Sequence, residues 1–187
     1  MRGWRNAVVL ALTTALILGG VWAVQTWVRG DAGDPGSVTS VSVPSDVSPP
    51  ATGERAADFT ATTLDGQDLA LSGLRGQPVW LVFGATWCAN CRAEAPDVAK
   101  VARDYAGRVH VVSVYVGEST QTVKGYADRV GLTYAQVADP DQRIAAAYRI
   151  MGIPAHFFID AEGVIRSIRV GVVSPADAAA ELDALLG

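Results

Sequence analysis

The sequence is poor in the residues that build metal sites and nucleic-acid surfaces. Its 187 residues include only two cysteines and two histidines. A structural zinc site needs four ligands, and His110 and His156 lack the close spacing of a zinc finger. The formal net charge is −4, so no excess of Lys and Arg indicates a nucleic-acid partner. A zinc-finger or nucleic-acid-binding function is therefore not expected.

Charged residues are also missing from Asn6 to Val28, where nearly every side chain is apolar. As a helix, this stretch would span about 34 Å at about 1.5 Å per residue, enough to cross a bilayer core of about 30 Å. Arg2 and Arg5 precede it, which favours a cytoplasmic N-terminus. We therefore predict a signal-anchor over residues 1–29 that crosses the cytoplasmic membrane once and leaves the rest extracytoplasmic. A cleaved signal peptide is the alternative.

Residues 30–55 contain no aromatic side chain, and their only large aliphatic residues are a few valines. Gly, Ser, Pro, Asp and Thr dominate this segment. Such a composition buries too little apolar surface to offset the entropy of ordering the chain. We predict a flexible linker over 30–55 and a globular domain over 56–187.

Within the domain, continuous apolar runs such as PVWLVFG at 78–84 are typical of strands buried on both faces. Turn residues such as Asp65-Gly66 separate the first two strands. The order of the elements predicts an α/β domain whose sheet is covered by helices on both faces. The expected strands are 57–63, 68–71, 78–84, 109–116, 134–137, 156–159 and 164–170, and the expected helices are 89–105, 119–130, 141–148 and 175–186.

The two cysteines, Cys88 and Cys91, lie where the apolar strand 78–84 gives way to a helix. Unpaired backbone N–H groups and the positive dipole end at a helix N-terminus favour a thiolate. A thiolate is the attacking species in disulfide exchange, so this placement favours a reactive Cys88 and a resolving Cys91. A metal site and a structural disulfide stay open as alternatives, although a disulfide here would close too short a loop to stabilise much.

Four stretches together resemble the thioredoxin superfamily, and within it the membrane-anchored extracytoplasmic reductases that include TlpA-like and ResA-like proteins. They are AADFTATTLDG, VWLVFGATWCANCRAEAP, VVSVYVGES and YRIMGIPAHFFIDAEGVI. The resemblance covers residues 56–187. It implies a thioredoxin-like fold with a central mixed sheet, an N-terminal hairpin and a mid-domain insertion at about 119–150, preceded by one transmembrane helix.

The resemblance also implies roles for individual residues. Cys88 matches the exposed nucleophile and Cys91 the buried resolving thiol of a redox-active disulfide. Ile153 and Pro154 match the cis-proline loop that presents backbone to an incoming chain, and only a bond before proline adopts the cis form at low cost. Trp87 is expected to line the substrate groove, with plain packing as an equal alternative.

Glu118 matches an acidic residue that related reductases hold near the cysteines. A partly desolvated carboxyl there would have a raised pKa and could shuttle a proton, whereas the alternative is a solvated glutamate at a helix start. His156 is expected to be a packed strand histidine, although it could touch the site. Arg92 and Glu94 are expected on a solvated helix face.

By resemblance, the expected activity is reduction of protein disulfides by a thiol-disulfide oxidoreductase that needs no cofactor or metal. The electrons would come from a membrane thiol donor, and apocytochrome c is the expected substrate. The alternatives are a copper-site assembly factor or copper chaperone on the same fold, and an oxidant that makes disulfides. A peroxidase is not expected, because the chain lacks a lone peroxidatic cysteine in its Thr/Pro setting.

Overall fold

The computed structural model describes residues 13–14, 17–20, 41–44 and 50–187. The chain divides into two units, 1–38 and 39–187. Most of the predicted membrane anchor, 1–29, lies outside the described residues, and it stays a prediction. Across the described ranges, no helix combines the length and the apolar character that crossing a membrane requires.

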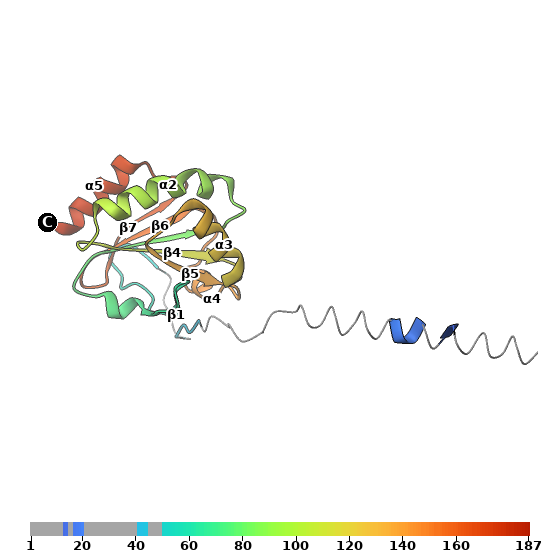
Figure 1. Ribbon diagram of the computed structural model, residues 1–187. Coiled ribbons are helices and arrows are strands. Elements are labelled where there is room, and N and C mark those ends of the chain that lie inside the picture. Colours follow the sequence, from blue (N-terminus) through green and yellow to red (C-terminus); the bar gives the residue numbers. More distant parts are fainter. Residues whose placement is uncertain (1–12, 15–16, 21–40, 45–49) are drawn as a thin grey trace, which may run out of the picture. The chain divides into compact units, whose positions relative to one another are not determined.

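A mixed five-stranded sheet forms the centre of the second unit, with the strand order β5-β4-β3-β6-β7 (Figure 1). Strand β3 pairs in parallel with β4, and β4 in parallel with β5, whereas β6 runs antiparallel to both β3 and β7. A two-stranded antiparallel hairpin precedes the sheet. The predicted mixed sheet and N-terminal hairpin are therefore confirmed. The strands are β1 Thr60–Thr62, β2 Asp68–Ala70, β3 Val79–Gly84, β4 His110–Val116, β5 Ala135–Asp139, β6 Ala155–Ile159 and β7 Ile165–Val170.

Helices cover both faces of the sheet, as Figure 1 shows. Two helix starts are capped by serine, since Ser119 and Ser174 each accept a backbone N–H bond from the first turn of the helix that follows. The helices are α2 Ala89–Asp104, α3 Thr120–Val130, α4 Arg143–Ala147 and α5 Pro175–Leu186, with a short 3-10 helix, η1, at Leu71–Leu74. The predicted helices are thus all present in this unit.

Strand β3 is buried on both faces, as its continuous apolar run predicts. Trp80 and Val82 pack with residues of α2 and α5 on one face. Leu81 and Phe83 pack on the other face with α4 and the N-terminal hairpin. Because successive side chains of a strand point to opposite faces, one strand contributes to both cores. The C-terminal end of β3, where the cysteines follow, is therefore held from both sides.

Part of the predicted linker belongs to the domain, which corrects the predicted boundary at residue 56. Ser42 forms a bridge with Thr60. Further along, Gly53 N donates to Ile165 O at 2.8 Å, and Ile165 N donates to Glu54 O at 2.9 Å. These residues are held by backbone hydrogen bonds. Side-chain composition does not reveal such bonds, so it did not predict that these residues belong to the domain.

Candidate active site

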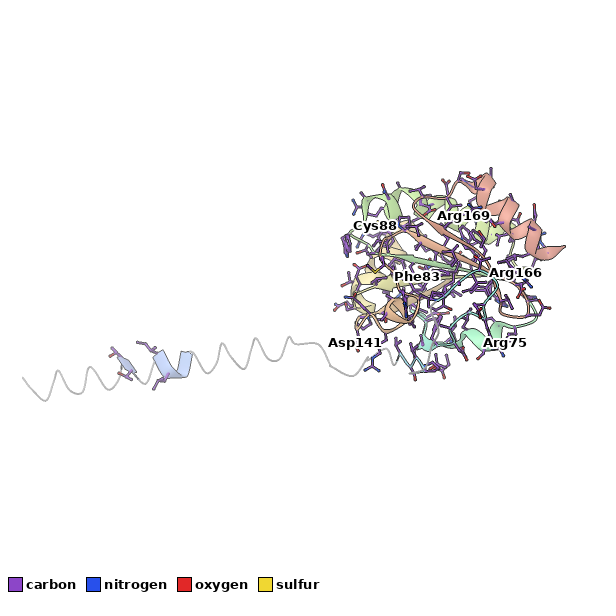
Figure 2. All side chains as sticks on the ribbon, turned by 180° about the vertical axis from the view of Figure 1, so that it is seen from behind. Arg75, Phe83, Cys88, Asp141, Arg166 and Arg169 are labelled. Atoms are coloured by element: carbon purple, nitrogen blue, oxygen red, sulfur yellow. A yellow bond between two sulfur atoms is a disulfide. The ribbon has the colours of Figure 1, made fainter. Side chains whose placement is uncertain are left out.

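Cys88 occupies the N-cap of α2, immediately after the loop that leaves β3. It forms a disulfide with Cys91, and their Cα atoms are 5.2 Å apart. The Cys88 Sγ also accepts a hydrogen bond from Cys91 N at 3.2 Å. Figure 2 shows Cys88 at one edge of the domain, on the opposite side from Arg75. Once the disulfide is reduced, the backbone N–H groups and dipole of α2 favour a Cys88 thiolate.

The expected contrast between an exposed Cys88 and a buried Cys91 is wrong for this disulfide form. Cys88 is only 7% exposed, whereas Cys91 is half-buried. Cys88 is covered by the loop before β6, since its Sγ lies 3.9 Å from Ile153 O. The Cys91 side chain instead points inward, toward Gly84 of β3.

The bond between Ile153 and Pro154 is cis, which confirms the prediction for this loop. The loop is tied to the end of β7, because Gly171 N donates to Pro154 O at 2.8 Å. Large apolar side chains are exposed on the segments that flank the disulfide. Those most exposed are Trp87 at 67%, Met151 at 96%, Val170 and Val172.

Glu118 is buried, not solvated, at 8% exposure. Its carboxylate accepts hydrogen bonds from Thr86 N at 2.7 Å and from Thr86 Oγ1 at 2.5 Å. The loop before Cys88 is thereby fastened to the segment that follows β4. These contacts give Glu118 a structural role. A function of Glu118 as a proton shuttle stays a prediction.

Arg92 is exposed as expected, but it is not merely solvated. Its guanidinium donates to Thr86 O at 3.2 Å and to Trp87 O at 2.9 Å. Together with Glu118, it holds both sides of the loop that precedes Cys88. The position of Cys88 therefore depends on two charged side chains from different elements.

Glu94 is the functional residue that the sequence analysis missed, because the expected solvated position is wrong. It is 2% exposed and lies one turn after Cys91 on the inner side of α2. Its Oε1 accepts a hydrogen bond from Val173 N at 2.7 Å. Burial raises the pKa of Glu94 from 4.5 to about 7, against the lowering effect of the Val173 N–H, and the charge of Asp97 adds to the rise. The i, i+3 spacing from Cys91 is the signal that could have found it.

A small pocket of about 30 Å³ lies beside the disulfide. Cys91 and Glu94 both line it, together with Ser113, Tyr134 and Pro154, among others, whereas Cys88 does not. This volume can hold one water molecule. A water molecule there could pass a proton between the Cys91 thiol and the Glu94 carboxylate.

His156 is fully buried on β6, as expected of a packed strand histidine. It also contacts the site, because its Nε2 lies 3.3 Å from Glu94 Oε1. Burial lowers the pKa of His156 to about 4, although its contact with Gly171 O acts in the opposite direction. At neutral pH the imidazole is uncharged, so its contact with Glu94 is not an ion pair.

Within the described part of the chain, no three His, Cys, Asp or Glu side chains converge to hold a metal ion. The site as it stands is a pair of bonded sulfurs, a buried carboxyl and a neutral imidazole. These groups suit proton and thiol chemistry.

The sequence pattern of the AhpC/TSA family matches residues 52–168. The chain belongs to this family. It is a thioredoxin-superfamily protein of the ResA-like kind. Among its relatives, the thioredoxin-like protein YneN of Bacillus subtilis is 35% identical over 134 residues, which cover 70% of this chain and 78% of that protein.

Two further similar proteins are a thiol-disulfide oxidoreductase, matched by sequence, and a thioredoxin-family protein, matched by structure. The thiol-disulfide oxidoreductase ResA of Geobacillus kaustophilus is 34% identical over 136 residues, covering 72% of this chain and 78% of that protein. The crystal structure of a thioredoxin-family thiol:disulfide interchange protein from Chlorobium tepidum aligns with a TM-score of 0.66. It is 30% identical, and the match covers 76% of this chain and 100% of that one. The thioredoxin-like fold is therefore confirmed.

Proposed function

We propose that this thiol-disulfide oxidoreductase reduces disulfides of extracytoplasmic proteins through Cys88 and Cys91, and that apocytochrome c is its substrate. The observation that carries the proposal is that the two cysteines lie in different surroundings. Cys88 caps α2 beside the cis-proline loop, while Cys91 lines a small pocket together with Glu94. This difference supports Cys88 as the attacking sulfur and Cys91 as the resolving one.

In the first step, the Cys88 thiolate attacks one sulfur of the substrate disulfide. A mixed disulfide forms between Cys88 and the substrate, and the second substrate sulfur leaves as a thiolate that takes a proton from water. The helix N-terminus at Cys88 favours the thiolate that this step requires.

In the second step, Cys91 gives its proton to Glu94 and attacks the Cys88 Sγ. The bond between Cys88 and the substrate breaks and the disulfide between Cys88 and Cys91 forms. The substrate sulfur leaves as a thiolate that takes a proton from water, so the substrate is released as a dithiol. Two electrons have then passed to the substrate. A membrane thiol donor must return them, because an oxidising compartment offers no reducing pool.

The exposed apolar side chains beside the disulfide support a polypeptide substrate. Trp87, Met151, Val170 and Val172 project from three separate segments around the cis-proline loop. Exposed apolar surface of this kind marks interaction sites. The substrate would be unfolded or extended, so that its disulfide can reach Cys88.

Localisation is part of the same proposal. The uncharged run from Asn6 to Val28 would anchor the chain in the cytoplasmic membrane, with the thioredoxin-like domain outside. The resemblance to membrane-anchored reductases favours apocytochrome c, whose paired cysteines must be reduced before haem attaches. Neither the anchor nor the substrate follows from the site geometry.

The test is a substrate trap in the native host. In Cys91→Ser the second step cannot occur, so substrates stay bound to Cys88 by a disulfide that reducing agent releases. The double variant Cys88→Ser/Cys91→Ser is the matched control and should capture nothing. Capture of apocytochrome c supports the proposal. Capture of copper-site proteins would favour the copper-assembly alternative, and captured envelope proteins without any cytochrome would contradict the proposed substrate.

A further inference from the structure

His156 and Glu94 face each other between the sheet and α2, out of contact with solvent. The Nε2 atom of His156 lies 3.3 Å from Glu94 Oε1 and 3.2 Å from Gly171 O. A carbonyl oxygen can only accept a hydrogen bond, so the contact with Gly171 assigns the ring proton to Nε2. The same N–H therefore lies within reach of the Glu94 carboxylate.

The other ring nitrogen of His156 then carries a lone pair. Nδ1 is buried and has no hydrogen-bond partner among the described residues. An unpaired buried acceptor destabilises a fold, and an aliphatic side chain would fill this strand position without that cost. Packing alone does not account for a histidine at position 156.

Neighbouring rings fix the direction of the imidazole. The Trp80 ring lies 5.9 Å from that of His156, tilted by 31°. Trp80 itself stacks on Phe158, with ring centroids 5.6 Å apart. Because these rings come from β3 and β6, the imidazole is positioned by the core of the domain and not by α2.

We propose that His156 is a positioning residue that sets the proton affinity of Glu94, and with it the pH range in which Cys91 can give up its proton. The inference rests on the proposed function, in which Glu94 receives that proton. The partial positive charge of the Nε2–H group, whose nitrogen lies 3.3 Å from Oε1, favours the charged carboxylate and so opposes the effect of burial.

Each element around Glu94 contributes a group to this balance. Asp97 on α2 disfavours the charged carboxylate, and Tyr134 beside β5 is close enough to sense its charge. Val173 N and His156 Nε2 are the two groups that contact Oε1. Loss of His156 would leave the backbone N–H as the only donor, so the neutral form of Glu94 would persist to higher pH.

The test follows the Glu94 carboxyl carbon by ¹³C NMR in the purified full chain, with Glu94→Gln identifying its signal. The wild-type midpoint is expected near pH 7. In His156→Leu, which removes the donor, the midpoint should rise by about one pH unit, a tenfold change in proton affinity. His156→Gln places an amide N–H near the position of Nε2 and should keep the wild-type midpoint. A merely structural His156 would lower stability in His156→Leu without moving the midpoint, and that result would overturn the inference.

A second measurement needs no variant at position 156, so it holds even where His156→Leu does not fold. The ring nitrogens of His156 in the wild type should show a protonated Nε2 and a bare Nδ1 by ¹⁵N NMR. The Nε2 signal should shift with the same midpoint as Glu94. A proton on Nδ1, or a signal that ignores the Glu94 titration, would contradict the inference. These titrations are independent of turnover, so an inactive protein that titrates as expected would contradict only the proposed function.

Discussion

Glu94→Gln should change how the stability of the domain depends on pH. Burial raises the pKa of Glu94 from 4.5 to about 7, so between these values the folded state holds a proton that the unfolded chain releases. The stability that this proton contributes is complete below pH 4.5 and is lost as the pH rises to 7. At about 1.4 kcal/mol per pH unit, the loss amounts to about 3 kcal/mol.

His156 contributes a slope of the opposite sign. Burial lowers its pKa from 6.5 to about 4, so between these values the unfolded chain holds the extra proton. Its contribution is complete above pH 6.5 and is lost as the pH falls to 4, again by about 3 kcal/mol. Between pH 4.5 and 6.5 the two slopes cancel in the wild type.

Glu94→Gln removes one slope and leaves the other. The free energy of unfolding of the variant, minus that of the wild type, should rise by about 1.4 kcal/mol per pH unit between 4.5 and 7. Titrating groups away from the contact between Glu94 and His156 are common to both proteins and drop out of this difference. His156→Gln is the matched control, because it should give a difference of the opposite slope between pH 4 and 6.5.

Urea unfolding followed by tryptophan fluorescence measures both differences, from about pH 4 to about pH 8, with the disulfide intact. Trp80 in the core reports the unfolding of this domain. A difference for Glu94→Gln that stays flat between pH 4.5 and 7 would refute the reasoning. It would mean that Glu94 has the same pKa in the folded state as in the unfolded chain. Glu94 would then not have the raised pKa that suits it to accept the proton of Cys91.

Two further predictions concern the loop before Cys88. Thr86→Val deletes the hydroxyl that donates to buried Glu118 and should lower the free energy of unfolding by about 1–3 kcal/mol in urea melts, whereas Thr122→Val at the exposed start of α3 should change it by less than about 0.5 kcal/mol. An equal loss in both variants would argue against the buried contact. Trp87→Ala, at a side chain 67% exposed, should raise the KM for a peptide disulfide while leaving stability within about 0.5 kcal/mol. Val130→Ala, an exposed apolar residue on α3, serves as its control, and an unchanged KM for Trp87→Ala would remove Trp87 from the substrate groove.

Local patterns in the sequence predicted most of the fold. The uninterrupted apolar run of β3 predicted a strand buried on both faces, and the structure shows one. The i, i+3 cysteines after that strand predicted a reactive pair at a helix N-terminus. These features depend on neighbours in the chain, so the sequence was sufficient for them.

The extent of the domain was harder to predict. Residues Gly53 and Glu54 have the composition of a linker, yet they hydrogen-bond through their backbone to β7. Side-chain patterns report burial of apolar surface, and they carry no record of backbone pairing at a sheet edge. The predicted boundary was therefore too close to β1.

By itself, the sequence determined an α/β domain with a cysteine pair at a helix N-terminus. Its resemblance to the thioredoxin superfamily implied the thioredoxin-like fold, the disulfide between Cys88 and Cys91, and the cis bond before Pro154. Only the tertiary structure decided which carboxyl lies next to Cys91. Glu94 reads as a surface residue in a polar stretch of helix, but the packing of α2 against β6 and the loop before α5 turns it inward. Its partners Val173 and His156 are distant in the chain, and burial among them raises its pKa, so its chemistry follows from contacts that local sequence does not encode.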